Sequence, residues 1–333
     1  MCLCERIRIA LKIQCVQIFT GIAIIGIIYS EELTNAREKN SGVITTKKGN
    51  FMKKIKSIEV LAAKIRRWII EEVYSAKSGH PGGSLSCADF LACVYEKYLN
   101  FDSNHPEMID RDRVVLSKGH CAPALYAVLA LKDYFPLNDL KTFRKIDSYL
   151  QGHPCMKSIP GVDMSTGSLG QGISAAVGMA LASRAEKYDN WIYVILGDGE
   201  LQEGQVWEAV MCAAHYGLNR LVAFVDLNGL QIDGNTATVM NVGDVAKKFK
   251  AFDWNVLSLD GNNVSELDMA LDTIHRAKTD KPTVIVGNTI KGKGVSFMQG
   301  QYQWHGSTPN QEQYETAVSE LDAKINELEK CHE

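Results

Sequence analysis

The sequence lacks the features that mark several classes of protein. Its formal net charge is only −3 over 333 residues, so it has no strongly basic surface of the kind that binds nucleic acid. None of its 9 cysteines forms a Cys-x-x-Cys pair, and their odd number and scattered spacing argue against a disulfide framework and against a structural zinc site. The chain also lacks internal repeats and low-complexity linkers. These absences predict a globular protein of the reducing cytoplasm.

The composition agrees with that prediction. Hydrophobic residues make up 46% of the chain and charged residues 23%, which is ordinary for a globular protein and excludes a disordered tail or a coiled coil. A chain of this length can bury a sizeable core and has room for one large domain or two small ones.

The first 51 residues form a leader of different character. Residues 13–29 are almost wholly apolar and follow several basic residues, as in a signal peptide or a short membrane anchor. However, the run is short for a bilayer span and no small-x-small cleavage site follows it. Lys-Gly-Asn codons just before Met52 would resemble a ribosome-binding site. We therefore expect translation to start at Met52, which makes residues 52–333 the domain proper and a membrane association unlikely.

Helix and strand patterns alternate along this domain. Apolar residues at spacings of three and four predict helices, and short apolar runs predict strands. Helices are expected over 55–74, 87–98, 123–134, 171–188 and 203–216, with a tail helix from about 311, and strands over 113–117, 192–196, 221–226 and 283–288. Gly-rich loops are expected at 78–84 and 151–154. The alternation predicts an α/β fold, a parallel sheet with helices on both faces. The tail helix is expected to pack on its own domain or on a neighbour.

Oxygen-bearing side chains follow two of the predicted strands. Gly197-Asp198-Gly199 ends one strand, and Asn228 comes directly after the next. Ligands of doubly wound sheets bind at the carboxyl ends of the strands. A carboxylate, an amide oxygen and a nearby backbone carbonyl are ligands that Mg²⁺ takes, completing its shell with phosphate oxygens and water. The helix that begins near Glu203 adds backbone N–H groups. This combination is similar to the thiamine-diphosphate motif.

The histidines fall into two groups. Four lie in Gly- or Pro-rich segments, which favours a functional site over a structural role. These are His80, His120, His153 and His305. We interpret the remaining four as structural: His105, His215, His275 and His332.

Together these segments closely resemble the transketolase family. The resemblance runs from about residue 55 to about residue 313 and matches the N-terminal, diphosphate-binding half of that enzyme, which implies the thiamine-diphosphate-binding fold. The matching segments are SGHPGGSLS (78–86), LSKGH (116–120), QGHP (151–154), STGSLGQGISAAVGMAL (165–181), LGDGELQEGQVWEA (196–209), DLNGLQIDG (226–234) and HG (305–306).

The resemblance also implies roles for single residues. Those implied to bind the metal, which is Mg²⁺ or else Ca²⁺ or Mn²⁺, are Asp198, Asn228 and the carbonyl of Leu230. Those implied to contact thiamine diphosphate are Gly167, Ser168, Leu169 and Gly199, together with the metal ligands, His120 and His305. Glu203 matches an acidic residue that links the two active sites of the dimer. The four site histidines match those that surround the thiazolium ring, bind substrate hydroxyls and move protons. Cys155 departs from the family, which usually has an acidic residue there.

The half of the family's enzymes that binds the aminopyrimidine ring is not matched. We therefore expect one part of a split transketolase, which is active only with a separate C-terminal subunit in a two-plus-two heterotetramer. It would move a two-carbon ketol unit from a ketose phosphate, such as xylulose 5-phosphate, to an aldose phosphate, such as ribose 5-phosphate, in the pentose phosphate pathway.

Three alternatives stay open. The enzyme could act on a different sugar, which is branched, sulfonated or an amino sugar. It could be the alpha subunit of a 2-oxo acid dehydrogenase, although the four histidines argue against that. It could also be a non-catalytic orphan half that retains the cofactor fold.

Overall fold

The structure is a computed structural model that describes residues 41–330, and the side chains of residues 53–330. The expected leader therefore lies outside the described residues up to residue 40. The chain divides into two units, residues 1–54 and 55–333. The described part of the first unit, residues 41–54, is helical, and the fold below is that of the second unit. Within the described residues, no helix combines the length and hydropathy needed to span a bilayer.

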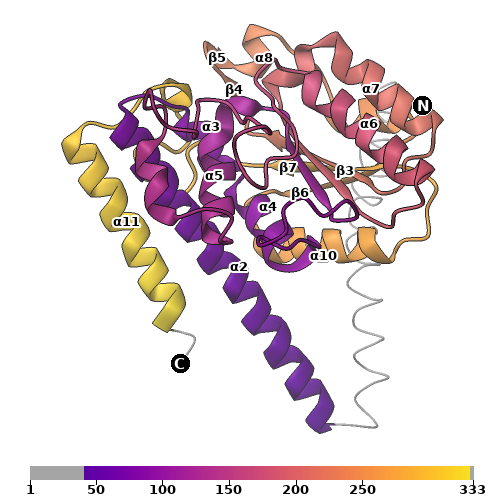
Figure 1. The fold of residues 1–333 in the computed structure, drawn as a ribbon, viewed down its shortest axis with the longest axis horizontal. Coiled ribbons are helices and arrows are strands. Elements are labelled where there is room, and N and C mark those ends of the chain that lie inside the picture. The colour runs from indigo at the N-terminus through magenta and orange to yellow at the C-terminus, as the bar shows by residue number, and fades with distance from the viewer. Residues whose placement is uncertain (1–40, 331–333) are drawn as a thin grey trace, which may run out of the picture. The chain divides into compact units, whose positions relative to one another are not determined.

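A parallel five-stranded sheet forms the centre of the second unit (Figure 1). Its strand order is β1-β2-β3-β7-β6, and every neighbouring pair is parallel. The strands are β1 Arg113–Leu116, β2 Ile192–Gly197, β3 Leu221–Leu227, β6 Asn255–Asp260 and β7 Thr283–Asn288. This confirms the predicted parallel sheet and each of its four predicted strands.

The strand β6 was not predicted. It lies at an edge of the sheet, and none of its residues is fully buried. Its sequence mixes Val256, Leu257 and Leu259 with polar residues instead of forming a continuous apolar run. An edge strand that is covered incompletely does not need such a run, so its pattern is weaker than that of a central strand.

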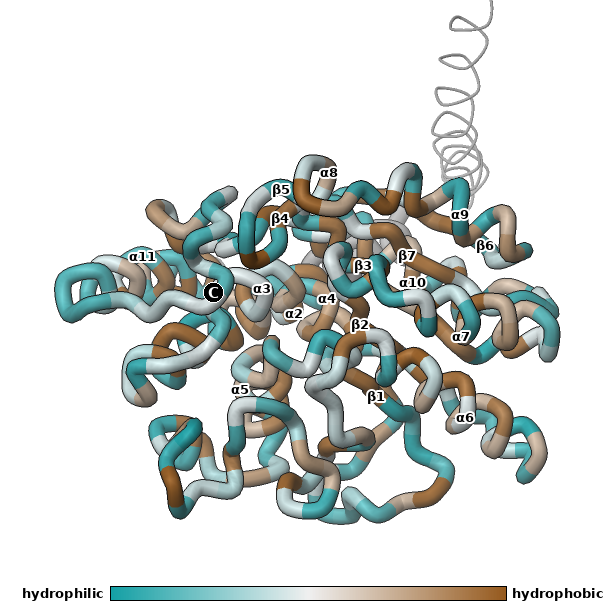
Figure 2. The backbone as a smooth tube through the Cα atoms, turned by 90° about the horizontal axis from the view of Figure 1, so that it is seen from above, coloured by the Kyte–Doolittle hydropathy of each residue, from teal (hydrophilic) through white to brown (hydrophobic). Residues whose placement is uncertain are grey.

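Helices cover both faces of the sheet, as expected. On β2, Tyr193 and Ile195 face a core that also contains residues of α4, α5 and α10, whereas Val194 and Leu196 face a second core with α6, α7 and α9. Hydrophobic residues run along the central strands in Figure 2. The helices are α2 Ser41–Ala76, α3 Pro81–Ser86, α4 Ala88–Cys93, α5 Ala122–Leu131, α6 Gln171–Ala185, α7 Gly204–His215, α8 Thr236–Val239, α9 Val245–Ala251, α10 Val264–Arg276 and α11 Gln311–Lys330.

Several expectations about the first helices are wrong. The segment 78–84, predicted as a loop, contains the start of α3, which has Pro81 in its first turn and all of its residues buried. Burial on every side outweighs the low helix propensity of its two glycines. The helix expected over 87–98 is instead α4 followed by a π-helical turn at Val94–Tyr98. The helix expected to begin near residue 55 begins at Ser41.

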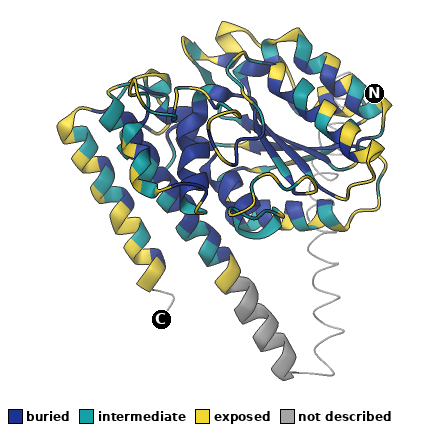
Figure 3. Ribbon diagram, in the orientation of Figure 1, coloured by how far each residue is buried: buried dark blue, intermediate teal, exposed yellow. Residues whose placement is uncertain are grey.

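The C-terminal helix α11 packs against the part of α2 that belongs to the same unit, as predicted (Figure 3). Tyr314 stacks on Tyr74 with a ring-centroid distance of 3.9 Å, and its hydroxyl donates to Glu71 Oε2 at 2.6 Å. Leu321 and Leu328 are buried in the same interface, whereas most of the other side chains of the helix are exposed. The helix is thus held by one apolar face.

Candidate active site

A cavity of about 320 Å³ opens where β1, β2, β3 and β7 end. Segments that follow each of these strands contribute to its wall: Lys118 after β1, Gly197–Gly199 after β2, Asn228 after β3 and Lys291 after β7. The predicted site residues that line it are His80, His120, Gly167, Leu169, Asp198, Gly199, Glu203, Asn228, Leu230 and His305. Ser168 and His153 stand outside this lining. The carboxyl edge of the sheet therefore collects nearly all of the predicted site.

Three of the predicted histidines form a triangle on one wall. The ring centroids of His80 and His120 are 5.1 Å apart, those of His80 and His305 are 5.4 Å apart, and those of His120 and His305 are 5.1 Å apart. His120 and His305 lie in the short 3-10 helices Gly119–Cys121 and Tyr302–His305. The three histidines of the triangle are far apart in the sequence, so no local motif contains them together.

All three imidazoles are held in the neutral form. Burial, followed by the charges of neighbouring groups, lowers the pKa of His80 and of His120 to about 4 and that of His305 to about 3. His305 also has a fixed tautomer, because Lys291 Nζ donates to its Nδ1 at 2.9 Å. The proton of this ring is therefore on Nε2.

The fourth histidine packs against Gly167, which lines the cavity. Gly167 has a φ of +147°, and a Cβ on it would lie 3.1 Å from the ring of His153. The hydroxyl of Tyr126 donates to the backbone oxygens of Gln151 and His153 at 2.8 and 3.0 Å. His153, an exposed residue, thus lies beside Gly167, and its pKa is lowered by partial burial and by the charge of Arg144.

The predicted metal ligands converge at the ends of β2 and β3. Asp198 accepts hydrogen bonds from the backbone N–H of Gly199 at 2.8 Å and of Gly229 at 2.6 Å. Asn228 Oδ1 accepts one from Leu230 N at 3.1 Å. Burial and the nearby charge of Asp226 raise the pKa of Asp198 to about 6, and a bound cation would counter both effects. These oxygen donors fit a hard divalent cation.

The predicted metal site differs from a cluster of acidic, histidine and cysteine side chains. Among the described residues, no group of three or more His, Cys, Asp and Glu residues is placed to hold a metal ion. The set described above contains one carboxylate, and its other donors are an amide and a backbone carbonyl.

Sequence reasoning missed two lysines of the site. Lys118 is fully buried, forms an ion pair with Asp226 and donates to Gly83 O at 2.8 Å. Lys291 donates to Leu230 O at 2.9 Å as well as to His305, and its pKa is lowered by burial. Both follow a strand at the carboxyl edge of the sheet, which is the signal that could have identified them.

Glu200 was also missed. It accepts hydrogen bonds from the Ser117 hydroxyl and from the backbone N–H groups of Gly170 at 2.9 Å and Gly197 at 3.0 Å. Its carboxylate thereby holds together three loops that meet at the cavity. Glu203, by contrast, is exposed at the rim.

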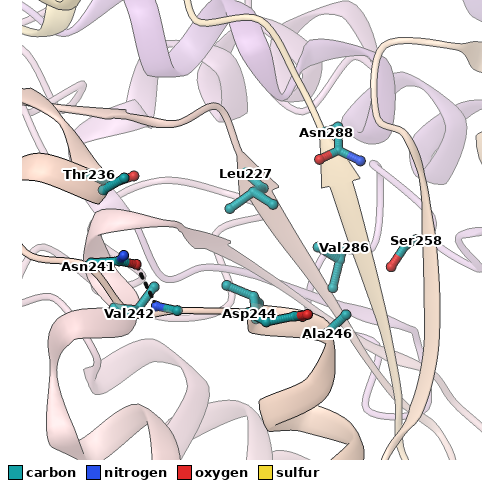
Figure 4. A pocket seen from close by; sticks show the side chains of 12 residues that line it. Leu227, Thr236, Asn241, Val242, Asp244, Ala246, Ser258, Val286 and Asn288 are labelled. Carbon is teal, nitrogen blue, oxygen red and sulfur yellow. Dashed lines mark hydrogen bonds between the residues drawn. The ribbon is translucent and has the colours of Figure 1, made fainter. Parts of the chain in front are cut away.

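A second cavity of about 360 Å³ lies at the ends of β3 and β7 (Figure 4). Leu227, Val242 and Val286 supply much of its apolar wall, and Asn241 and Asn288 add amide groups. None of the predicted site residues lines it. The predicted site residues therefore lie in the first cavity, although the second cavity has the larger volume of the two.

The fold and the first cavity define an α/β protein with a histidine cluster and an oxygen-ligand site at the carboxyl edge of its sheet. Residues 57–326 match the family model described as transketolase, thiamine diphosphate binding domain. The chain belongs to the transketolase family and corresponds to its N-terminal subunit or half. This membership decides against the 2-oxo acid dehydrogenase alternative.

Two relatives are named as transketolase subunits, and the match covers nearly all of each. The chain is 46% identical to the 6-deoxy-6-sulfo-D-fructose transketolase subunit SqwG of Clostridium sp. (strain MSTE9), over 78% of this chain and 94% of that one. It is 40% identical to one of the subunits of apulose-4-phosphate transketolase from Phocaeicola vulgatus, over 83% of this chain and 98% of that one.

Solved transketolases share the fold over part of their length. The structure of the Pichia stipitis enzyme matches with a TM-score of 0.74 and 32% identity, and the match covers 83% of this chain and 45% of that one. The Leishmania mexicana enzyme matches with a TM-score of 0.74 and 31% identity, again over 45% of its chain. The chain thus spans less than half the length of these enzymes.

Proposed function

We propose that this chain is the N-terminal subunit of a split transketolase and works together with a separate C-terminal subunit. The observation that carries the proposal is the share of each relative's length that the chain covers. The chain covers 94% and 98% of relatives named as transketolase subunits, but 45% of solved transketolases. Relatives of this extent are named as subunits, which supports a partner that would supply the rest of the active site.

We propose a sulfonated ketose as the donor substrate, with a branched ketose phosphate as the second candidate. Support comes from the names of the two relatives, which refer to 6-deoxy-6-sulfo-D-fructose and to apulose 4-phosphate. The first expectation, xylulose 5-phosphate with ribose 5-phosphate as the acceptor, becomes the comparison that any assay must include.

The metal and the cofactor would be held by residues of the first cavity and by Ser168 next to them. Asp198, Asn228 and the carbonyl of Leu230 would bind Mg²⁺, or Ca²⁺ or Mn²⁺, and the metal would bind the diphosphate. The cofactor would rest against Gly167, Ser168, Leu169 and Gly199, with His120 and His305 beside it. When bound, thiamine diphosphate supplies the nucleophilic carbon and the electron sink for breaking a carbon–carbon bond.

The histidine triangle would handle the protons of the substrate hydroxyls. Neutral imidazoles can accept a proton from a hydroxyl or donate one to it. His305 offers Nε2–H as a donor, because Lys291 donates to Nδ1. His80 and His120 line the same cavity, and His153, which packs against the cavity-lining Gly167, would join them beside the substrate. We propose that Glu203, exposed at the rim, contacts the partner subunit.

Reconstitution tests the function. The purified chain, given thiamine diphosphate, Mg²⁺, a donor ketose and an aldose acceptor, should show no measurable transfer. Addition of the C-terminal subunit should restore transfer, faster with 6-deoxy-6-sulfo-D-fructose than with xylulose 5-phosphate. An Asp198→Ala variant should fail in the complex, whereas a Lys187→Asn variant on the exposed surface should retain activity.

Two results would contradict the proposal. Robust turnover by the chain alone would refute the need for a partner. A stable complex that binds the cofactor but transfers no ketol unit from any of these donors would favour the non-catalytic alternative.

A further inference from the structure

Arg144 has a strained backbone next to the histidine site. Its φ is +58°, in the left-handed region that residues other than glycine seldom occupy. Strain of this kind persists where the surrounding structure enforces it, and it is concentrated at functional sites.

The side chain of Arg144 connects the loops that lead into two site histidines. Nη1 donates to the hydroxyl of Ser78 at 2.7 Å, two residues before His80. The guanidinium lies against Gly152, the residue before His153. A Cβ at Gly152 would stand 2.7 Å from Nε and 2.8 Å from Nη2. The backbone N–H of Arg144 donates to Leu150 O at 2.8 Å, which closes the second loop onto the arginine.

The positive charge of Arg144 has no carboxylate partner. Among the described residues, no Asp or Glu oxygen forms an ion pair with it, and its buried Nε has no hydrogen-bond acceptor. The charge therefore acts on the nearby histidines. After burial, Arg144 is the largest contribution to the lowered pKa of His153, and His120 follows. The pKa of His80 is lowered first by burial and then by the charge of His120. Arg144 follows, with His153 and Lys291 after it.

We propose that Arg144 is a positioning residue that clamps the loops of His80 and His153 together and keeps both imidazoles in place beside the substrate. The residue does not line the cavity, so it acts through the two histidines. An arginine suits this task because its planar head can donate to Ser78 on one edge while the rest of it covers Gly152. The inference rests on the proposed function for its kinetic test.

Three variants separate the clamp from general effects. Arg144→Asn removes the guanidinium and keeps a residue that tolerates the left-handed backbone. Gly152→Ala keeps the charge, but its methyl group takes the place of the guanidinium, and the backbone at Gly152 is outside the left-handed region. Lys187→Asn is the matched control, because Lys187 is exposed, has a φ of +62° and carries the same charge.

We expect kcat/KM of the reconstituted complex to fall about 10- to 100-fold for Arg144→Asn and for Gly152→Ala, since small displacements of catalytic groups cost that much. Lys187→Asn should leave it unchanged. In NMR titrations of the chain, the pKa of His153 should rise in Arg144→Asn but not in Lys187→Asn. Gly152→Ala serves as the test if Arg144→Asn fails to fold.

Retention of kcat/KM within about twofold of the wild type by both site variants would overturn the clamp. An inactive wild-type complex would instead overturn the proposed function. In that case the titration, which needs no substrate, decides about Arg144: an unchanged pKa of His153 in Arg144→Asn would refute the inference.

Discussion

The protonation of the site histidines is decided residue by residue, mainly through burial. Taking an imidazole out of water disfavours its charged form, and the cations Lys118 and Lys291 add to that effect at His120 and His305. A neutral ring can accept a proton from a sugar hydroxyl, which an imidazolium cannot do. The burial that lowers the pKa of these side chains thus also prepares them for the proposed chemistry.

We predict that His80, His120 and His305 stay neutral when the folded chain is taken from pH 8 to pH 5.5, because their pKa values are about 4, 4 and 3. Imidazole chemical shifts from ¹H–¹⁵N NMR measure this directly. In the urea-unfolded chain the same rings should titrate near the ordinary histidine pKa of about 6.5.

The same difference affects stability. Because the folded pKa values lie below the unfolded value, the unfolded chain binds more protons between about pH 6.5 and 4, and these histidines lower the free energy of unfolding as the pH falls through that range. Asp198 has the opposite effect on the free energy of unfolding, since its folded pKa of about 6 lies above the ordinary value of 3.8. A histidine of the triangle that titrates between pH 6 and 7 in the folded chain would contradict the prediction.

The C-terminal helix shows how an element is held at the scale of secondary structure. Tyr314 stacks on α2 and hydrogen-bonds to Glu71, and Arg67 Nε donates to Asp322 at 3.2 Å. Exposed ion pairs contribute little, so the buried leucines carry most of the docking energy.

We expect Leu321→Ala to lower the free energy of unfolding by about 2–5 kcal/mol, because the leucine is only 2% exposed and its loss leaves a cavity. Urea denaturation followed by circular dichroism gives the value. Ile325→Ala, on the same helix but only partly buried, is the control and should cost clearly less. Equal, small effects of both variants would mean that α11 is not docked in solution.

How well each element could be predicted from the sequence follows from its surroundings. The central strands β2 and β3 have apolar runs because both of their faces are covered, and they were predicted almost to the residue. The edge strand β6 has a weaker pattern and was missed. The short helix α3 was missed because its glycines disfavour a helix locally, and only its complete burial stabilises one.

At the scale of the whole molecule, three exposed apolar residues, of which Ile232 alone lines the cavity, form an apolar rim along one segment. Ile232 is 65% exposed, Met240 is 60% exposed and Val239 is 40% exposed, and all three lie in the segment that follows Asn228. Exposed apolar residues that cluster beside a site favour an interaction surface. The proposed C-terminal subunit would cover this rim and close the cavity.

We predict that the two subunits assemble as a two-plus-two heterotetramer, which sedimentation analysis of the reconstituted complex measures. Met240→Glu should weaken assembly by placing a charge in the apolar contact. Ile109→Glu is the control, because Ile109 is similarly exposed but precedes β1, at the amino edge of the sheet. A one-to-one complex, or equal effects of both variants, would contradict the prediction.

The sequence alone determined the parallel sheet and placed Asp198 and Asn228 at the same edge of it. Buried strands must be apolar, and residues directly after parallel strands must share an edge, so Asp198 and Asn228 could be placed together from the sequence. Only the tertiary structure revealed the contacts of Lys118, Lys291 and Arg144, the lowered pKa values of the histidines and the contact of His153 with Gly167. These features depend on burial and on contacts between segments far apart in the chain, such as Ser78 with Arg144, which no local pattern encodes.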